Sequence, residues 1–397
     1  MLTDHQLSER PAPVLDDLLR LAERSTALLD HRRGLTPALA AEISAAGFAR
    51  HFVPRRWGGT AGLFHPLADA VASLAQACAS TAWCASLYAA HGRLASYLPE
   101  QGQREVWGES PDVRIAAALA PPAAEAVAEC RDALDGWRLD GTWFLVSGVG
   151  QADWVLLAGP CAEGRGPGQR LFAVPVAAVD VLDTWRNSGL RGTGSNTVML
   201  GDVFVPEHRT FTIAELGRVR PGDAHCHAVP FQLTAPLQFA APVLGAARGA
   251  LRDWTRVMAG KRRPDGRPAR ESAAVQQVLA EASAQIHAAE LLLCHAADRA
   301  DTAVYRTEQG PGAPLPASAE NQRDLAVAAG LCTSAVARLF QTAGARCQSE
   351  EHPLQRRWRD VSAAAGHVAL DLEAAAAAYA PAAFAAAGAA GPGGGRA

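Results

Sequence analysis

The sequence lacks the features that mark several large classes of protein. Its 8 cysteines are scattered without a Cys-x-x-Cys pair, which disfavours a zinc module and a disulfide framework. No secretory signal is visible, and no apolar run reaches the roughly 18 residues of a membrane helix. The net charge of −3 gives no basic face for nucleic acid. These absences predict a soluble, cytoplasmic protein with reduced thiols that binds neither nucleic acid nor membrane.

A glycine-rich turn lies in GLRGTGSNTVMLGDVFVP, residues 189–206, and could be taken for a nucleotide-phosphate loop. Such a loop needs a helix directly after it, because the N–H groups of the helix N-terminus bind the phosphate. Here Thr197–Leu200 and Val203–Val205 are β-type runs separated by the turn dipeptide Gly201-Asp202. We therefore expect strand, turn and strand, and no nucleotide-binding βαβ unit.

His225-Cys226-His227 is the one cluster with metal-ligand residue types. Zinc usually takes four ligands, and three adjacent side chains cannot all point at one ion. We expect a loop at these residues and no metal site.

Three kinds of sequence pattern follow one another along the 397 residues. Residues 1–110 show helical periodicity, with Thr36-Pro37 as an N-cap and first-turn pair. Residues 111–225 contain short runs of Val, Leu, Phe and Trp between turn residues, which is typical of a β domain. Residues 226–387 predict a four-helix bundle, and residues 388–397 a disordered tail. The bundle segments are Val243–Met258, Ser272–Asp301, Ala317–Ala343 and Pro353–Ala380, and the N-terminal domain includes a long apolar segment from His65 to Tyr97.

This order of helices, β domain and bundle resembles the acyl-CoA dehydrogenase fold, an α+β architecture. The resemblance covers almost the whole chain and rests on FVPRRWGG, DGWRLDGTWFLVSG, QADWVLL, GLRGTGSNTVMLGDVFVP and PLQRRWRD. It implies a flavin between the β domain and the bundle, and a homotetramer with the bundles at its core. It also identifies residues 189–206 as the family's final barrel hairpin.

Two departures from the dehydrogenase pattern point to another branch of that family. Dehydrogenases often carry a catalytic Glu in I-Y-E-G-T after the Arg-Asp of the last helix, whereas RDVSAAAGHVAL places His367 there. Their flavin-contacting Gly-Ser-Asp loop is replaced by ALAPPAAEA. The chain resembles the oxygenase components of two-component flavin monooxygenases, which hydroxylate 4-hydroxyphenylacetate, steroid-derived phenols or dibenzothiophene. Members carry a histidine after R-W-R-D, a Ser-Gly closing a β strand and often a histidine on an N-terminal helix, matched here by His367, Ser147-Gly148 and His91.

The resemblance implies a reaction of reduced FMN or FAD with O2, through a C4a-hydroperoxide, that hydroxylates a phenolic or polycyclic aromatic molecule. Ser147 is then expected beside the N5 edge of the flavin. A histidine with a pKa near working pH would remove the phenol proton. We assign His367 to the peroxide and His91 to the phenol, and the reverse stays open. From pattern alone, a core histidine on an amphipathic helix is the better interpretation of His91, and the motif context makes the core and catalytic interpretations about even.

Leu145, Ser147 and Gly148 are the candidate flavin contacts of the β domain. Dehydrogenases have Trp where this chain has Leu145, so an aromatic contact is lost and weaker binding is expected. Weak binding suits a diffusible reduced flavin. Because no nicotinamide-binding unit is visible, a separate NAD(P)H-dependent flavin reductase is the expected partner.

The bundle contributes further candidates by resemblance. Gln341 and Gly344 in FQTAGA match a Q-x-x-G-G segment that reaches the flavin of a neighbouring subunit, although an alanine replaces one glycine. Among the arginines at positions 262–270, Arg263 is our candidate for a flavin phosphate.

Three other functions stay open at this point. One is an acyl-CoA dehydrogenase with a displaced base, Glu290 or Glu350. The others are an amino-sugar N-oxygenase on the same fold, which needs no phenol-activating base, and a non-catalytic helical oligomer. The product is equally open between a natural-product intermediate and a degradation intermediate. The segment between β domain and bundle is expected at the mouth of the pocket, and there contact with an aromatic ligand and a solvent-facing loop are equally open for His225, His227 and Phe231.

Overall fold

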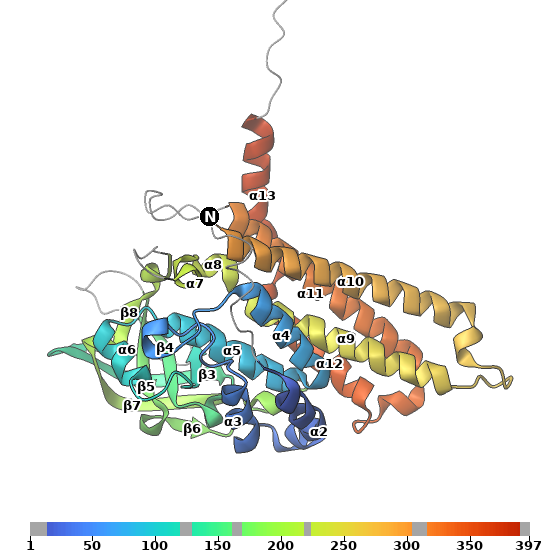
Figure 1. The fold of residues 1–397 in the computed structure, drawn as a ribbon, viewed down its shortest axis with the longest axis horizontal. Coiled ribbons are helices and arrows are strands. Elements are labelled where there is room, and N and C mark those ends of the chain that lie inside the picture. The colour runs from blue at the N-terminus through green and yellow to red at the C-terminus, as the bar shows by residue number, and fades with distance from the viewer. Residues whose placement is uncertain (1–13, 120–128, 161–168, 218–223, 304–315, 390–397) are drawn as a thin grey trace, which may run out of the picture.

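The computed structural model describes residues 14–119, 129–160, 169–217, 224–303 and 316–389 (Figure 1). Residues 390–397 of the expected tail and most of the ALAPPAAEA segment lie outside these residues, whereas residues 388 and 389 end the last helix, so the prediction of a disordered tail is wrong at those two positions. Helices cover one side of a β region and continue into a long bundle that projects away from it (Figure 1).

The first part of the chain is helical, as predicted. Thr36 caps its helix by accepting a hydrogen bond from the Leu39 N–H, and the apolar segment after His65 divides into two helices at Cys78. The second of them, α5, is buried along nearly its whole length because most of its residues are small or apolar. The helices are α2 (Asp16–Arg32), α3 (Pro37–Ala45), α4 (Phe64–Ala77), α5 (Ala79–Ala95) and α6 (Glu100–Trp107).

Two four-stranded sheets make up the described β region. Their inner faces share an apolar core that includes Trp137, Trp143 and Phe172. One sheet has the order β1-β4-β5-β8 and the other β2-β3-β7-β6, and within the two sheets only β1 and β4 pair in parallel. The strands are β1 (Ile115–Ala118), β2 (Glu129–Ala133), β3 (Gly136–Val146), β4 (Trp154–Pro160), β5 (Gln169–Pro175), β6 (Asp180–Leu182), β7 (Asn196–Pro206) and β8 (Thr210–Thr212).

The prediction of a turn at Gly201-Asp202 is wrong. β7 runs as one strand along β3, and the turn-type residues lie where the pairing register shifts between Leu139 and Gly141. Asp202 has a φ of 52° there. A β-bulge absorbs an extra residue inside a strand, so local turn chemistry did not end the strand. The glycine-rich loop before β7 does join strand to strand, and no helix follows it.

The C-terminal part is a helical bundle, but the prediction of one continuous fourth helix, Pro353–Ala380, is wrong. The chain breaks at Gly366, and His367 accepts a hydrogen bond from the Ala369 N–H to cap the short turn that follows. His367 therefore lies between two helices rather than on one. The helices are α9 (Leu237–Gly260), α10 (Ala273–Thr302), α11 (Pro316–Ala343), α12 (Pro353–Ala365) and α13 (Leu372–Ala389).

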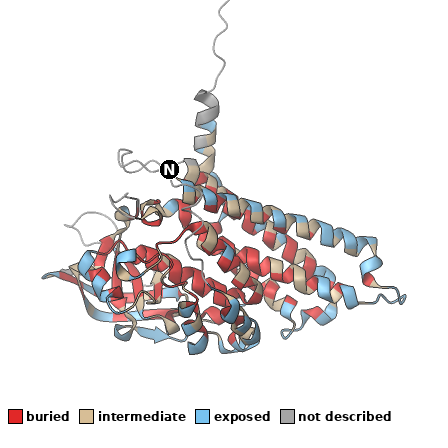
Figure 2. Ribbon diagram, in the orientation of Figure 1, coloured by how far each residue is buried: buried red, intermediate tan, exposed pale blue. Residues whose placement is uncertain are grey.

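One described helix segment, Ala317–Ala343 in α11, is long and apolar enough to cross a membrane by length and composition. This differs from the expectation that no run reaches that length. Half of its most apolar window is buried, and Leu325, Cys332 and Val336 lie in the large core shared with α9 and α10. A core helix of a bundle passes the same test, so the segment is weak support for a membrane span. Figure 2 shows buried residues concentrated on the inward faces of the bundle and on α4 and α5.

Two short helices connect the β region to the bundle, α7 (His225–Ala228) and α8 (Phe231–Thr234). The expectation of a loop at His225-Cys226-His227 is thus wrong. Each histidine is held by a main-chain carbonyl: Nε2 of His225 bonds to Ala300 O at 2.9 Å and Nε2 of His227 to Phe52 O at 2.7 Å. These bonds to distant segments stabilise the helical turn.

Candidate active site

A chain of hydroxyl groups starts at Ser147, directly after β3. The indole Nε1 of Trp83 on α5 donates to Ser147 Oγ at 3.2 Å. Ser147 Oγ lies 2.8 Å from Ser195 Oγ, which lies 2.7 Å from Thr193 Oγ1. Ser195 and Thr193 are buried, whereas Ser147 is only partly buried. The GTGS turn therefore serves to support Ser147 with hydroxyl groups.

Gly148 ties the same three segments together through its backbone. Its N–H donates to Thr193 O at 2.9 Å, and its carbonyl accepts from the Tyr88 hydroxyl at 2.7 Å. Its φ is +72°, and a Cβ at this position would lie 2.7 Å from the Tyr88 oxygen. Only glycine meets both conditions without strain.

Helix α12 holds the loop that carries these hydroxyls. Asp360 accepts the Leu190 N–H at 2.7 Å, and the Arg359 guanidinium donates to Ser188 O at 2.5 Å. A Cβ on Gly189 would overlap the Arg359 carbonyl, so the loop packs directly on the helix backbone. Burial raises the pKa of Asp360 to about 6. The R-W-R-D motif thus positions the loop.

His367 lies beside Trp83 and stacks on Phe239. The ring centroids of His367 and Phe239 are 3.7 Å apart at 19°, and the Trp83 centroid is 5.8 Å away in an edge-on arrangement. Burial lowers the pKa of His367 to about 4, so the imidazole is neutral near pH 7. Because Nδ1 accepts from the Ala369 N–H, the neutral ring carries its hydrogen on Nε2. His367 therefore presents an N–H donor near Trp83.

His91 lies two turns after Trp83 on α5, about 12 Å along the helix axis. It is buried, and its Nδ1 donates to Ile115 O of β1 at 2.8 Å. Burial lowers its pKa to about 4. Among the described residues, no hydrogen bond or ring contact joins His91 to Ser147 or His367. With Nδ1 donating, Nε2 of the neutral ring is an acceptor.

The end of β3 offers a surface that fits a flat ring with a hydrogen-bonding edge. The register jumps from Trp143–Val198 to Val146–Asn196, so Phe144 and Leu145 bulge out of the ladder. Leu145 has a φ of 61° and is 67% exposed. Together with the Ser147 oxygen and the His367 N–H, this bulge supplies the apolar and polar contacts that an isoalloxazine ring would need.

The bundle candidates lie elsewhere. The turn between α9 and α10, which contains Arg263, is at the end of the bundle far from the sheets (Figure 1). Arg263 is exposed and 3.4 Å from Asp265. Gln341 lies exposed in a groove between α10 and α11, and Gly344 lies near Lys261, which donates to Ala343 O at 2.9 Å. Within one chain these residues do not meet Ser147.

A narrow, mostly apolar cavity of about 30 Å³ lies between α4, α5, α8 and α9. It has room for water and not for an aromatic ring. Of the three residues expected at a pocket mouth, Phe231 lines this cavity, together with Phe52, Ser86 and Arg93. His225 and His227 do not line it.

The displaced-base alternatives also lie away from Ser147. Glu290 on α10 is paired with Arg248 at 2.5 Å. Burial raises its pKa, but Arg248 and His287 outweigh that effect and hold the pKa below its usual value. Glu350 is exposed in the turn before α12. Neither carboxylate is arranged like a buried base beside a flavin.

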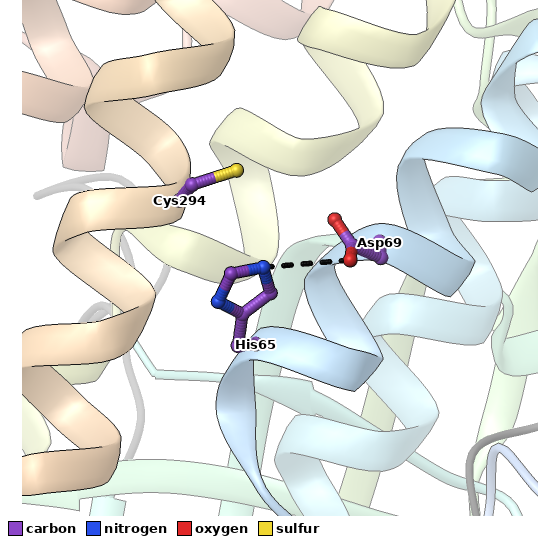
Figure 3. A group of neighbouring side chains, drawn as sticks. All are labelled: His65, Asp69 and Cys294. Atoms are coloured by element: carbon purple, nitrogen blue, oxygen red, sulfur yellow. Dashed lines mark ion pairs between the residues drawn. The ribbon is translucent and has the colours of Figure 1, made fainter.

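His65, Asp69 and Cys294 form a group in which one potential ligand atom from each lies within 4.8 Å of the others (Figure 3). His65 already uses both ring nitrogens, with Nδ1 2.5 Å from Asp298 and Nε2 3.4 Å from Asp69. Asp69 and Asp298 are more than half exposed. The arrangement is that of an ion-pair cluster linking α4 to α10.

Sequence reasoning missed most of the partners of Ser147 and His367. Trp83 touches both, and Phe239, Thr193 and Ser195 complete the cluster. Trp83 lies in the long apolar segment from His65 to Tyr97 and Ser195 in the glycine-rich turn, so the sequence predicted only a helix and a turn at these positions. Their contacts bridge 64 and 48 residues of sequence, beyond any local pattern.

Known proteins resemble this chain over nearly its full length. The family model for the acyl-CoA dehydrogenase C-terminal domain matches residues 237–372. The oxygenase subunit HsaA of a flavin-dependent monooxygenase from Rhodococcus jostii is 33% identical, covering 92% of this chain and 96% of that protein. The chain belongs to this family of flavin-dependent oxygenase components. The oxygenase component of an FADH(2)-dependent resorcinol hydroxylase from Rhizobium sp. is 32% identical over 90% of this oxygenase and 89% of the relative.

Solved structures agree with that assignment of the oxygenase. The 3-HSA hydroxylase from Rhodococcus sp. matches with a TM-score of 0.83 and 29% identity, covering 96% of this chain and 97% of that one. XiaF from Streptomyces sp., solved with FADH2 and glycerol, matches with 0.84 and 26%, covering 93% of each chain. The predicted fold, enzyme class and oxygenase branch are confirmed, and reduced flavin is confirmed as the cofactor of the family.

Proposed function

We propose that this oxygenase hydroxylates a small aromatic molecule with O2 and a reduced flavin delivered by a separate NAD(P)H-dependent reductase. Relatives are named for resorcinol, p-hydroxyphenylacetate and indole-3-acetate, all of them aromatic, and several are named as components or subunits. The observation that carries the proposal is the meeting of Ser147 and His367 at Trp83 beside the bulged end of β3.

When bound, the flavin supplies the two electrons and the site of oxygen activation. Ser147 would hold its edge, and Leu145 and Gly148 would hold the ring. His367 would offer its Nε2–H as a hydrogen-bond donor to the oxygen, and Trp83 and Phe239 would exclude water from that position. A neutral imidazole suits this role because it donates without adding a buried charge.

His91 is the proposed base for the substrate hydroxyl. Its Nδ1–H bond to Ile115 O fixes the tautomer that leaves Nε2 as an acceptor. Removing a proton efficiently needs a pKa near the working pH, well above the value of about 4 in this structure. An ionising phenol beside the ring would raise that pKa, because a nearby negative charge favours the imidazolium.

We further propose that Gln341, Gly344 and Arg263 complete the flavin site of a second copy within a homotetramer. Their position at the far end of the bundle supports this, since one chain cannot bring them to its own Ser147. Residues from one copy would then hold the cofactor against the β region of another. A cytoplasmic location is proposed as well, supported by six cysteines that are free thiols in the described part of the chain, five of them buried.

Rapid mixing tests the function. The protein is loaded anaerobically with reduced FMN or FAD and mixed with oxygenated buffer while the flavin spectrum is recorded. A long-lived absorbance that differs from both oxidised and reduced flavin is expected, followed by a hydroxylated product from a panel of phenols. Reoxidation as fast as that of free flavin, with every phenol present and no product, would refute the proposal.

Two variants separate the histidines in the same assay. His367→Asn should shorten the transient absorbance and waste reduced flavin without product. His91→Asn should keep the transient and lose product formation from phenols. The opposite pattern would exchange the two assignments.

A further inference from the structure

The hydroxyl chain at Ser147 has a preferred direction, which follows from counting protons. A hydroxyl has one hydrogen to donate, and an indole N–H can only donate. Trp83 therefore fixes one end of the chain, with Ser147 Oγ accepting at 3.2 Å. At the other end Thr193 Oγ1 lies 2.9 Å from the Leu190 carbonyl, which can only accept.

The three hydroxyl hydrogens can be arranged in several ways, and in two of them the donors run in one direction along the whole chain. In the outward-accepting one, Ser147 donates to Ser195, Ser195 to Thr193 and Thr193 to Leu190 O. In the outward-donating one, Thr193 donates to Ser195, Ser195 to Ser147, and Ser147 points its hydrogen out of the chain. The first arrangement makes three internal hydrogen bonds, one more than any arrangement in which Ser147 points its hydrogen outward.

The direction of the hydroxyl chain decides whether the exposed side of Ser147 offers a hydrogen-bond acceptor or a donor. Trp83 and Ser195 occupy its other positions in the described structure, and Ser147 is only partly buried. In the favoured arrangement its oxygen offers a lone pair outward and no hydrogen. A reduced flavin has a hydrogen on N5, whereas an oxidised flavin has a lone pair there and needs a donor.

We propose that Thr193 and Ser195 are positioning residues that set the oxidation-state preference of the flavin site by orienting the Ser147 hydroxyl. The inference rests on the proposed function, because it assumes that Ser147 contacts the flavin edge. An internal hydrogen bond of ordinary strength makes the preference for reduced over oxidised flavin on the order of fivefold. The direction of the hydroxyl chain thereby favours binding of reduced flavin, which the reductase delivers, over binding of oxidised flavin.

The test is equilibrium binding of reduced and oxidised flavin to the wild-type protein and to two variants. Thr193→Val removes the final donor, which leaves the Ser195 hydrogen free to point at Ser147 and turns Ser147 outward. Ser195→Ala removes the acceptor of the Ser147 hydrogen. In each variant the dissociation constant of oxidised flavin divided by that of reduced flavin should fall on the order of fivefold, chiefly because oxidised flavin binds more tightly. A fivefold change corresponds to a fall of about 20 mV in the midpoint potential of the bound flavin, which is an independent readout.

Two controls distinguish orientation from packing. Thr210 makes a matching bond to the carbonyl three residues earlier, Glu207 O, at the same 2.9 Å, and is also buried. Thr210→Val should leave the ratio unchanged. Thr193→Ser keeps the hydroxyl and should retain the wild-type ratio.

The outcomes separate the two proposals. If the protein binds neither form of flavin, the proposed function fails and the inference falls with it. If both forms bind and neither Thr193→Val nor Ser195→Ala changes the ratio or the potential, the orientation inference is overturned while the function stands. An equal shift in Thr210→Val would also overturn it.

Discussion

Gly148→Ala should lower the stability of the fold, whereas Gly150→Ala, only two residues away, should leave it nearly unchanged. At Gly148 the backbone has a φ of +72°, which costs about 1–2 kcal/mol for alanine. The new methyl would also lie 2.7 Å from the Tyr88 oxygen and displace it from the Gly148 carbonyl. Losing a buried hydrogen bond adds about 1–3 kcal/mol, so the free energy of unfolding should fall by about 2–5 kcal/mol.

At Gly150 a Cβ meets nothing within 4 Å, and the residue is outside the positive-φ set. Its substitution should change the free energy of unfolding by less than about 0.5 kcal/mol. Urea unfolding followed by tryptophan fluorescence measures both variants. Gly148→Ala should also weaken the binding of reduced flavin, because Ser147 is its direct neighbour.

A double variant isolates the steric part of the effect. Tyr88→Phe removes the hydroxyl that the methyl would displace but leaves the ring carbon 3.0 Å from the new Cβ. Gly148→Ala in the Tyr88→Phe background should therefore cost less than in the wild type, yet more than zero. Equal stability of Gly148→Ala and Gly150→Ala would refute the geometry assigned to this turn.

Three further predictions concern stability. Gly189→Ala should lower the free energy of unfolding by about 1–3 kcal/mol and weaken reduced-flavin binding, because its methyl overlaps the Arg359 carbonyl; a neutral result in urea unfolding would contradict that packing. Burial lowers the pKa of His51 from 6.5 to about 4, so the unfolded chain binds the extra proton as pH falls. From pH 7 to pH 5 this histidine alone should reduce the free energy of unfolding by about 2 kcal/mol. His51→Gln should remove that loss, and a His51→Gln protein with the same dependence of stability on pH as the wild type would disprove the prediction. Thr36→Ala should cost about 0.5–2 kcal/mol by leaving the Leu39 N–H uncapped, and calorimetry would show no shift if the cap contributes nothing.

The order of helices, strands and helices was determined by the sequence alone. Helical and strand periodicities depend on neighbours within a few residues, so Thr36-Pro37, the long apolar segments and the absence of a helix after the GTGS turn could all be interpreted directly. The branch of the family could also be predicted from local sequence, because it depended on the residues after R-W-R-D and on LVSG. These features predicted the fold and the enzyme class without any knowledge of contacts, and the similar proteins confirm both.

Predictions from local sequence were wrong where contacts with distant segments outweighed the local preference. Gly201-Asp202 has the composition of a turn, but pairing with β3 carries β7 through it. The alanine-rich run after R-W-R-D continues the helical pattern, but the chain turns at Gly366 and seats His367 on Phe239. In both places hydrogen bonds or ring contacts from distant segments decided the backbone path.

The working arrangement of the site was decided only by tertiary structure. Trp83, Ser147, Ser195 and His367 come from a helix, a strand end, a loop and a helix break, and they meet because α5 is buried between the β region and the bundle. The direction of a hydrogen-bonded hydroxyl chain depends on which carbonyl stands at its end, and that carbonyl is placed by α12 through Asp360. Residue types can be read along a chain, but the orientation of a proton depends on neighbours that only folding brings together.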